Sequence, residues 1–364
     1  MATIGIVSTH GSKAALTLKD AILKFAPDAD VLIDAAYEED GICVREQLIF
    51  IFQCLERLTA KGAECAVFTD KAAHEYFSEL QDSTCLRLID PCFADGALKS
   101  PAQYAQNIIQ APQGLLPKPF TIGILGGMGP MASVDLYKKL TQLTPARKDQ
   151  EHIKLILVQN PQTPDRTECL LEHGKEPTIA LYKAAKTLED AGADCIAIGC
   201  NTAHAFLPAV SKHIRIPFVD MQETSLDEIE ALKGKSAVIG LLATTGTVRS
   251  GIYSQKAAAR GLALAVPDER NQEKVMRCIV GPKGVKAGFT DGECRQDLLD
   301  AAAYLVKEKG CNVLILGCTE LPLVLDEGEI QFDGKTAFCV DPTSAVARRL
   351  VSMALENRKK TRRM

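Results

Sequence analysis

The sequence predicts an α/β protein built from two pseudo-symmetric lobes, each with a parallel sheet, that face a shared cleft, together with a third, homologous lobe at the N-terminus. Three observations lead to this fold class. Runs of apolar, β-branched residues alternate with longer stretches of helical periodicity, which is typical of parallel α/β layers. A strand motif centred on glycine occurs three times, and a second motif follows each copy of the first. The chain therefore contains three internal repeats of one unit.

The first repeated motif is a short apolar strand. Its glycines, Gly5, Gly123 and Gly240, lie 118 and then 117 residues apart. The second motif is a glycine, a small residue and then an acid or amide at the start of another strand. Its three copies are Gly62-Ala63-Glu64-Cys65, Gly192-Ala193-Asp194-Cys195 and Gly310-Cys311-Asn312-Val313.

Each copy continues in the same way. Eight residues beyond the glycine of the second motif, the predicted strand ends at Asp70, Cys200 or Cys318. An acid follows that strand end after 20, 20 and 23 residues, at Asp90, Asp220 and Asp341. The number of matched positions indicates three homologous lobes.

The expected elements follow from the same patterns. We expect helices over Thr178–Ala191, Gln296–Lys309 and Thr343–Asn357, where apolar residues recur at helical spacing. The segment Met1–Val7 is a predicted first strand. The other predicted strands are Thr121–Gly127, Lys154–Gln159, Cys195–Gly199, Phe218–Met221, Ala237–Ala243, Leu262–Val266, Val313–Gly317 and Ala337–Asp341.

The repeats divide the chain into three lobes. The N-terminal lobe covers residues 1–116, the middle lobe covers 120–232 together with a C-terminal helix over 343–358, and the C-terminal lobe covers 236–342. Residues 110–119 contain three prolines and a glycine, which excludes a helix or a central strand and indicates a linker. Only a Lys-Gly-Lys turn separates the other two lobes, so we expect them to pack as one unit.

Composition excludes several classes of partner. The 364 residues include 42 Lys and Arg against 46 Asp and Glu, and the net charge of −4 argues against nucleic-acid binding. For the basic residues at 358–363, a solvated, frayed helix end is favoured over a contact with a polyanion. No apolar run reaches the roughly 18 residues of a membrane span, so we expect no membrane association.

The thirteen cysteines are an odd number in a long chain. No basic, apolar leader precedes the first strand, so we expect a cytoplasmic protein with mostly reduced thiols. The closest cysteine pair, Cys195 and Cys200, is five residues apart and forms no C-x-x-C motif. The six histidines show no ligand spacing, and we expect neither a metal nor another cofactor.

Cys200 and Cys318 occupy the same place in the middle and C-terminal lobes, at a predicted strand end. If the two lobes face each other about a pseudo-two-fold axis, both thiols point into one cleft from opposite sides. A strand end that leads into a helix also favours the thiolate. Two opposed thiols suit the removal of a proton from one face of a stereocentre and its return to the other. The alternative is that both are core cysteines, as free cysteines often are.

Five sequence blocks are shared with a known family: Gly123–Pro130, Asn160–Thr167, Gly199–His204, Leu242–Thr247 and Gly317–Leu321. In this order, they resemble the aspartate/glutamate racemase superfamily, and in particular its cofactor-independent aspartate racemases. The resemblance runs from Thr121 to about Leu355 and covers about two-thirds of the chain. Glu320, after the second Cys-Thr pair, resembles the aspartate branch, because the glutamate branch usually has histidine there.

The resemblance implies an amino-acid racemase, an isomerase that needs no pyridoxal phosphate, in which Cys200 and Cys318 are the catalytic acid and base. It implies aspartate as the substrate, with glutamate as the second candidate, and a homo-oligomer, commonly a dimer. Arg166 would clamp a substrate carboxylate through its planar guanidinium. The other substrate-binding positions that it implies are Asn201, Thr202, the backbone of Ala203, Lys286 and Thr319.

Several of these residues have a structural alternative. Arg166 on its own would be a surface ion pair, and Lys286, between glycines, a solvated loop lysine. For His204, a hydrogen-bonded helix histidine is favoured over a proton relay. Glu320 either sets the proton affinity of Cys318 or caps the following helix. The glycine-rich turn at 126–130 lacks the dinucleotide-binding pattern and is expected to let the backbone approach a small substrate.

The N-terminal lobe departs from the family pattern. Asp70 stands where the other lobes have cysteine, and the lobe has no Pro-Asp-Arg-Thr block, so we expect it to have no active site of its own. A packing role is favoured over a regulatory one. Two other functions stay open for the chain: a related isomerase or decarboxylase acting on a dicarboxylate, and a non-catalytic amino-acid-binding sensor. The cysteine pair, together with Arg166 and Lys286, favours the racemase.

Overall fold

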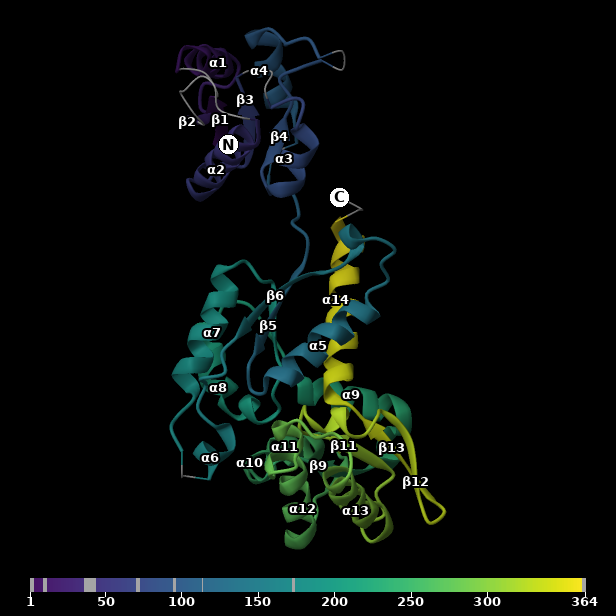
Figure 1. The fold of residues 1–364 in the computed structure, drawn as a ribbon. Coiled ribbons are helices and arrows are strands. Elements are labelled where there is room, and N and C mark those ends of the chain that lie inside the picture. The colour runs from purple at the N-terminus through teal and green to yellow at the C-terminus, as the bar shows by residue number, and fades with distance from the viewer. Residues whose placement is uncertain are drawn as a thin grey trace. The chain divides into compact units, whose positions relative to one another are not determined.

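The computed structural model describes residues 3–8, 12–35, 44–69, 73–93, 96–112, 114–171 and 174–361, so that Asp70 lies outside the described residues. The chain forms two compact units, Met1–Lys118 and Pro119–Met364. Each unit is built from parallel sheets covered by helices (Figure 1), and the predicted α/β fold class is confirmed. No helix in the described ranges is both long and apolar enough to cross a membrane.

The N-terminal unit holds one four-stranded parallel sheet with the strand order β2-β1-β3-β4. Side chains that alternate along β1 enter two cores: α1 and α4 cover one face of the sheet, and α2 and α3 cover the other. The elements are β1 (Thr3–Ser8), α1 (Ser12–Phe25), β2 (Asp30–Ala35), α2 (Val44–Ala60), β3 (Cys65–Phe68), α3 (Phe77–Ser83), β4 (Arg87–Ile89) and α4 (Pro101–Gln110).

The middle lobe repeats this sheet with the order β6-β5-β7-β8. Helix α5 and the C-terminal helix α14 cover one face, and α7 and α8 cover the other. The elements are β5 (Thr121–Gly126), α5 (Pro130–Leu143), β6 (Lys154–Gln159), α6 (Arg166–Leu170), α7 (Thr178–Asp190), β7 (Cys195–Ile198), α8 (Leu207–Val210), β8 (Phe218–Val219) and α9 (Met221–Lys233).

The C-terminal lobe has the strand order β10-β9-β11-β13-β12. Helices α12 and α13 cover one face, while α11 and α9 cover the other. The elements are β9 (Val238–Leu242), α10 (Thr245–Ser250), α11 (Ile252–Ala259), β10 (Ala263–Ala265), α12 (Glu269–Val280), α13 (Glu293–Lys307), β11 (Val313–Leu316), β12 (Gly328–Phe332), β13 (Lys335–Val340) and α14 (Pro342–Thr361).

The middle and C-terminal lobes exchange helices. Helix α9 follows the last strand of the middle lobe and packs on the C-terminal lobe, whereas α14 follows the last strand of the C-terminal lobe and packs on the middle lobe. The two helices also contact each other. This exchange makes one compact unit of the two lobes.

One strand departs from the all-parallel expectation. Strand β12 pairs with β13 in an antiparallel hairpin, which adds a fifth strand at the edge of the sheet. Its two-residue turn, Asp333-Gly334, has positive φ at both positions, 48° and 81°. An Asp-Gly pair is typical of such tight hairpin turns. This pair was the sequence signal for the hairpin, and our search for helices and parallel strands did not use it.

The repeated strand glycines let a helix approach the sheet. A Cβ atom added at Gly5 would lie 2.8 Å from a side-chain methyl of Leu58 on α2. At Gly240 it would lie 3.0 Å from a methyl of Leu305 on α13, and at Gly123 it would lie 3.3 Å from Cβ of Leu188 on α7. The register is also the same, because these glycines pair with Ala66, Leu314 and Ile196 of the neighbouring strand.

The glycines of the second motif end the helix that precedes the strand. Gly62, Gly192 and Gly310 have φ of 90°, 84° and 67°, in the left-handed region where glycine carries no steric cost. After Gly192, the amide of Ala193 donates to the carbonyl of Leu188, which closes the helix end in the manner of a Schellman turn. The second motif therefore recurs because, in each lobe, a glycine ends the helix just before this strand.

Candidate active site

A small pocket lies between the middle and C-terminal lobes, at the carboxyl ends of their strands. Open α/β sheets commonly carry their ligands at this edge. The pocket is a small, partly enclosed space. It is lined by Met128, Asp165, Arg166, Thr167, Cys200, Asn201, Thr202, Thr244, Lys286, Cys318, Thr319 and Glu320.

The pocket brings together seven of the eight site residues that the sequence predicted. The exception is Ala203, whose side chain is fully buried in the core beside α7 and α8 and does not line the cavity. The seven that meet at the pocket are Arg166, Cys200, Asn201, Thr202, Lys286, Cys318 and Thr319.

Cys200 lies two residues beyond the end of β7, and Cys318 lies two residues beyond the end of β11, at the equivalent edge of the other sheet. Both thiols are buried. The hydroxyl of Thr319 donates to the carbonyl of Gly199 at 3.2 Å, and this hydrogen bond joins the two strand ends across the lobe boundary. The two cysteines therefore enter one cavity from two lobes.

The thiol of Cys318 donates to Oε2 of Glu320 at 2.9 Å. Burial, and then the negative charge of Glu320, raise the pKa of Cys318 well above its ordinary value, and the ammonium of Lys286 opposes this. The expectation that the strand end favours the thiolate is wrong for Cys318. Only a three-residue 3-10 turn, Leu321–Leu323, follows it, so there is no helix dipole to offset burial beside a carboxylate.

Glu320 acts on the thiol and does not cap a helix. Its side chain makes no capping hydrogen bond to the following turn. Oε2 accepts from Cys318 and is also the more distant of two acceptors, at 3.4 Å, for the single hydroxyl proton of Thr319. Oε1 is buried and has no hydrogen-bond partner among the residues that the structure describes. The geometry thus supports the role in which Glu320 sets the proton affinity of Cys318.

Arg166 is held by the backbone of the middle lobe. Asp165 caps helix α6 by accepting from the amide of Thr167 at 2.8 Å, which places Arg166 in the first turn. The guanidinium donates to the carbonyls of Thr163, at 3.1 Å, and Met128, at 3.2 Å. It also donates to that of Pro164 at 3.0 Å.

All of these described partners of Arg166 are neutral carbonyls, and Nε is buried without a partner. The residue is 8% exposed, so the surface ion pair considered for it does not apply. A buried cation without an anionic partner is costly. An anionic ligand in the pocket would supply that partner.

Lys286 adds a second cation. It lies in a 3-10 turn, Val285–Ala287, which ends at Gly288 with φ of 96°. Burial lowers the pKa of its ammonium, but Glu320 and the two pocket thiols outweigh that effect, so that the pKa is raised. Lys286 is therefore charged at neutral pH and lines the cavity together with Arg166.

The two lobes meet closely at the pocket. The hydroxyl of Thr202 lies 2.7 Å from that of Thr247 and 3.1 Å from that of Thr244, which begins the next helix, α10. A Cβ atom at Gly246 would lie 2.8 Å from Cα of Thr167, so only glycine allows α10 to approach α6.

His204 has both ring nitrogens occupied. Nδ1 donates to the carbonyl of Cys200 at 2.9 Å, and Nε2 accepts from the amide of Met221 at 3.3 Å. Burial lowers the pKa of His204, which keeps the ring neutral. The hydrogen-bonded histidine favoured from the sequence is the form that the geometry supports.

Five lining residues were not among the predicted site residues. Glu320 had been noted only as a neighbour of Cys318. The others lie within the sequence blocks that carried the family resemblance, so their position in these blocks was the available signal. They are Met128, Asp165, Thr167 and Thr244.

Residues 125–350 match the family model described as Asp/Glu/Hydantoin racemase. The chain belongs to this family. The match spans both lobes that build the pocket and supports an amino-acid racemase, an isomerase that binds a small amino-acid substrate.

Relatives in this family carry different substrate names. The broad specificity amino-acid racemase RacX of Bacillus subtilis is 25% identical over 240 residues, which are 64% of this chain and 98% of RacX. The glutamate racemase of Aquifex pyrophilus is 31% identical over 154 residues, 41% of this chain and 56% of that enzyme. The solved structure of Picrophilus torridus aspartate racemase is 29% identical with a TM-score of 0.52, and the match covers 66% of this chain and 98% of that one.

Proposed function

We propose that this racemase interconverts L- and D-aspartate, with glutamate as the second candidate, by proton transfer between Cys200 and Cys318 and without pyridoxal phosphate. The observation that carries the proposal is one small cavity that holds both thiols and two cations, Arg166 and Lys286. A dicarboxylic amino acid supplies two carboxylates for these two cations.

The cavity also offers groups for the α-substituents of such a substrate. Nδ2 of Asn201 is buried and has no partner in the described part of the chain, while its Oδ1 accepts from the hydroxyl of Tyr253 at 2.8 Å. This amide is therefore fixed and free to donate to the α-carboxylate. The unpartnered Oε1 of Glu320 can accept from the α-ammonium.

The proton moves between the two faces of Cα. Oε2 of Glu320 takes the proton of the Cys318 thiol, and the thiolate so formed removes the Cα proton. The carbanion spreads its charge into the α-carboxylate, which the nearby cations and the amide of Asn201 stabilise. The thiol of Cys200 then gives its proton to the opposite face. After product release, the proton held by Glu320 is lost to solvent and the Cys200 thiolate takes one from solvent, which restores the starting state. The reverse reaction uses the same groups in the opposite order.

The small pocket favours a substrate with a short side chain over an elongated ligand. The match with Picrophilus torridus aspartate racemase covers 98% of that chain, and this supports aspartate as the substrate.

Exchange of the Cα proton in D2O tests the proposal. Incubation of the enzyme with L- or D-aspartate, followed by proton NMR, should show loss of the Cα signal and inversion from both hands. Exchange with glutamate alone would change the assigned substrate. Binding without exchange would indicate a sensor, and loss of carbon dioxide would indicate a decarboxylase.

We also propose, from the family resemblance, that the enzyme is a cytoplasmic homo-oligomer. Size-exclusion chromatography with light scattering tests the second part, and a monomer at micromolar concentration would contradict it.

A further inference from the structure

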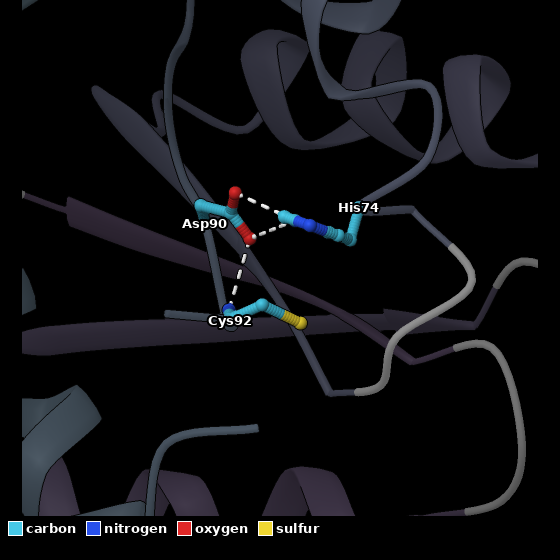
Figure 2. A group of neighbouring side chains, drawn as sticks. All are labelled: His74, Asp90 and Cys92. Carbon is cyan, nitrogen blue, oxygen red and sulfur yellow. Dashed lines mark hydrogen bonds and ion pairs between the residues drawn. The ribbon is translucent and has the colours of Figure 1, made fainter. Parts of the chain in front are cut away.

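Three side chains with different metal-binding atoms meet in the N-terminal unit (Figure 2). His74 lies in the turn before α3, and Asp90 and Cys92 follow β4. One ligand atom from each lies within 4.8 Å of the other two. Nδ1 of His74 contacts both carboxylate oxygens of Asp90, at 2.9 and 2.8 Å.

The backbone of this cluster is the same in all three lobes. The amide of Cys92 donates to Oδ1 of Asp90 at 2.9 Å. The equivalent amides, two residues beyond Asp220 and Asp341, donate to those acids at 2.8 Å in each case. The turn after the fourth parallel strand therefore holds its carboxylate in the same place in each lobe.

The side chains around this turn differ between the lobes. In the other two lobes a lysine pairs with the acid: Lys256 with Asp220, and Lys139 with Asp341. In the N-terminal lobe, Lys99 donates to the backbone carbonyl of Asp90 at 2.9 Å, and the partner of the carboxylate is the imidazole of His74.

The position two residues beyond the acid also differs. It is Gln222 in the middle lobe and Thr343 in the C-terminal lobe, but Cys92 in the N-terminal lobe. His204 of the middle lobe is the counterpart of His74 in the repeat, and its two ring nitrogens bind backbone groups. The first lobe alone thus places a thiol, an imidazole and a carboxylate around this turn.

We propose that His74, Asp90 and Cys92 bind a zinc-type divalent metal ion. Sulfur, nitrogen and carboxylate oxygen are the ligands that Zn²⁺ takes in proteins, whereas Mg²⁺ and Ca²⁺ require oxygen. Bonds of about 2.0–2.3 Å in a tetrahedron place ligand atoms about 3.5 Å apart, which small side-chain rotations reach from the present arrangement.

Metal binding has a simple proton balance. The thiol of Cys92 loses its proton to solvent. The imidazole of His74 binds through Nδ1 as the neutral ring with its proton on Nε2, so its contact with Asp90 is replaced by two metal bonds. Water fills the fourth position. Since the carboxylate of Asp90 and the side chain of His74 are about 30% and 27% exposed, the ion can enter from solvent. The ion would tie the turn after β3 to the turn after β4.

Cobalt titration of the full-length protein tests this site. Co²⁺ should bind with one equivalent per chain, give the near-ultraviolet absorption of a thiolate-to-cobalt bond, and be displaced by Zn²⁺. The substitution Cys92→Ser should abolish that absorption. Two matched controls should keep it: Cys85→Ser, which removes a partly exposed thiol of the same unit, and Cys200→Ser, which removes a thiol of the racemase pocket.

The outcomes separate the sites. The proposal is overturned if the cobalt–thiolate absorption survives in Cys92→Ser or disappears in Cys200→Ser. It is also overturned if the wild type binds no equivalent of Co²⁺. If Cys92→Ser does not fold, His74→Gln decides, because this partly exposed side chain can be replaced without opening the core; retained cobalt binding in it would also overturn the proposal.

Discussion

At the scale of single residues, the chemistry of the pocket depends on Glu320. Its carboxylate accepts from the Cys318 thiol at 2.9 Å and is itself 4% exposed. It thereby makes the thiol a weaker acid while serving as the acceptor for its proton. Two roles for this residue were open from the sequence, because a glutamate at a strand end can turn either toward the next helix or back to the cysteine, and only the folded loop decides.

The substitution Glu320→Gln should separate these two effects. Loss of the negative charge lowers the pKa of Cys318, so alkylation of this thiol, followed by mass spectrometry, should begin at a lower pH than in the wild type. Racemisation should fall by about 10²-fold, because no group then takes the thiol proton. Glu329→Gln, an exposed position on β12, is the matched control. An unchanged alkylation profile with unchanged turnover would refute the role of Glu320.

At the scale of elements, the sequence predicted most of the sheets because their causes are local. Each strand glycine is required by one packing contact with a helix, and each helix-ending glycine is required by one positive backbone angle. Both requirements occur again in every lobe, so the sequence pattern repeats. The exchange of α9 and α14 depends on contacts between lobes. The proposed metal ligands His74, Asp90 and Cys92 lie 16 and then 2 positions apart, a spacing that matches no ligand motif.

Two glycines of similar conformation provide a test of the loop after β5. Gly127 and Gly192 have φ of 97° and 84°, so alanine is strained at both. At Gly192 nothing lies within 4 Å of an added Cβ, whereas at Gly127 the backbone of Asn160 lies 2.6 Å away. Gly192→Ala should cost about 1 kcal/mol in the free energy of unfolding.

The substitution Gly127→Ala should cost more than Gly192→Ala and should also raise KM, because it displaces the loop whose Met128 carbonyl holds Arg166. Chemical denaturation and steady-state kinetics measure both effects. Equal costs for the two variants would show that the contact with Asn160 relaxes without penalty.

At the scale of the whole molecule, the racemase pocket is built entirely from the second compact unit. The match with a solved aspartate racemase covers 66% of this chain and 98% of that one. That relative therefore folds without a counterpart of the remaining third of this chain. Residues 119–364 alone should therefore be soluble and racemise with unchanged kcat. A loss of activity, or of an effector response seen in the full chain, would favour a regulatory N-terminal lobe.

The central claim is that two thiols from two lobes share one proton transfer. The most direct measurement is racemisation of L- and D-aspartate by Cys200→Ser and Cys318→Ser, each confirmed to be folded by circular dichroism. We expect each substitution to abolish racemisation in both directions, because a hydroxyl is too weak an acid to replace a thiol on either face. Full turnover in either variant would contradict the two-thiol mechanism.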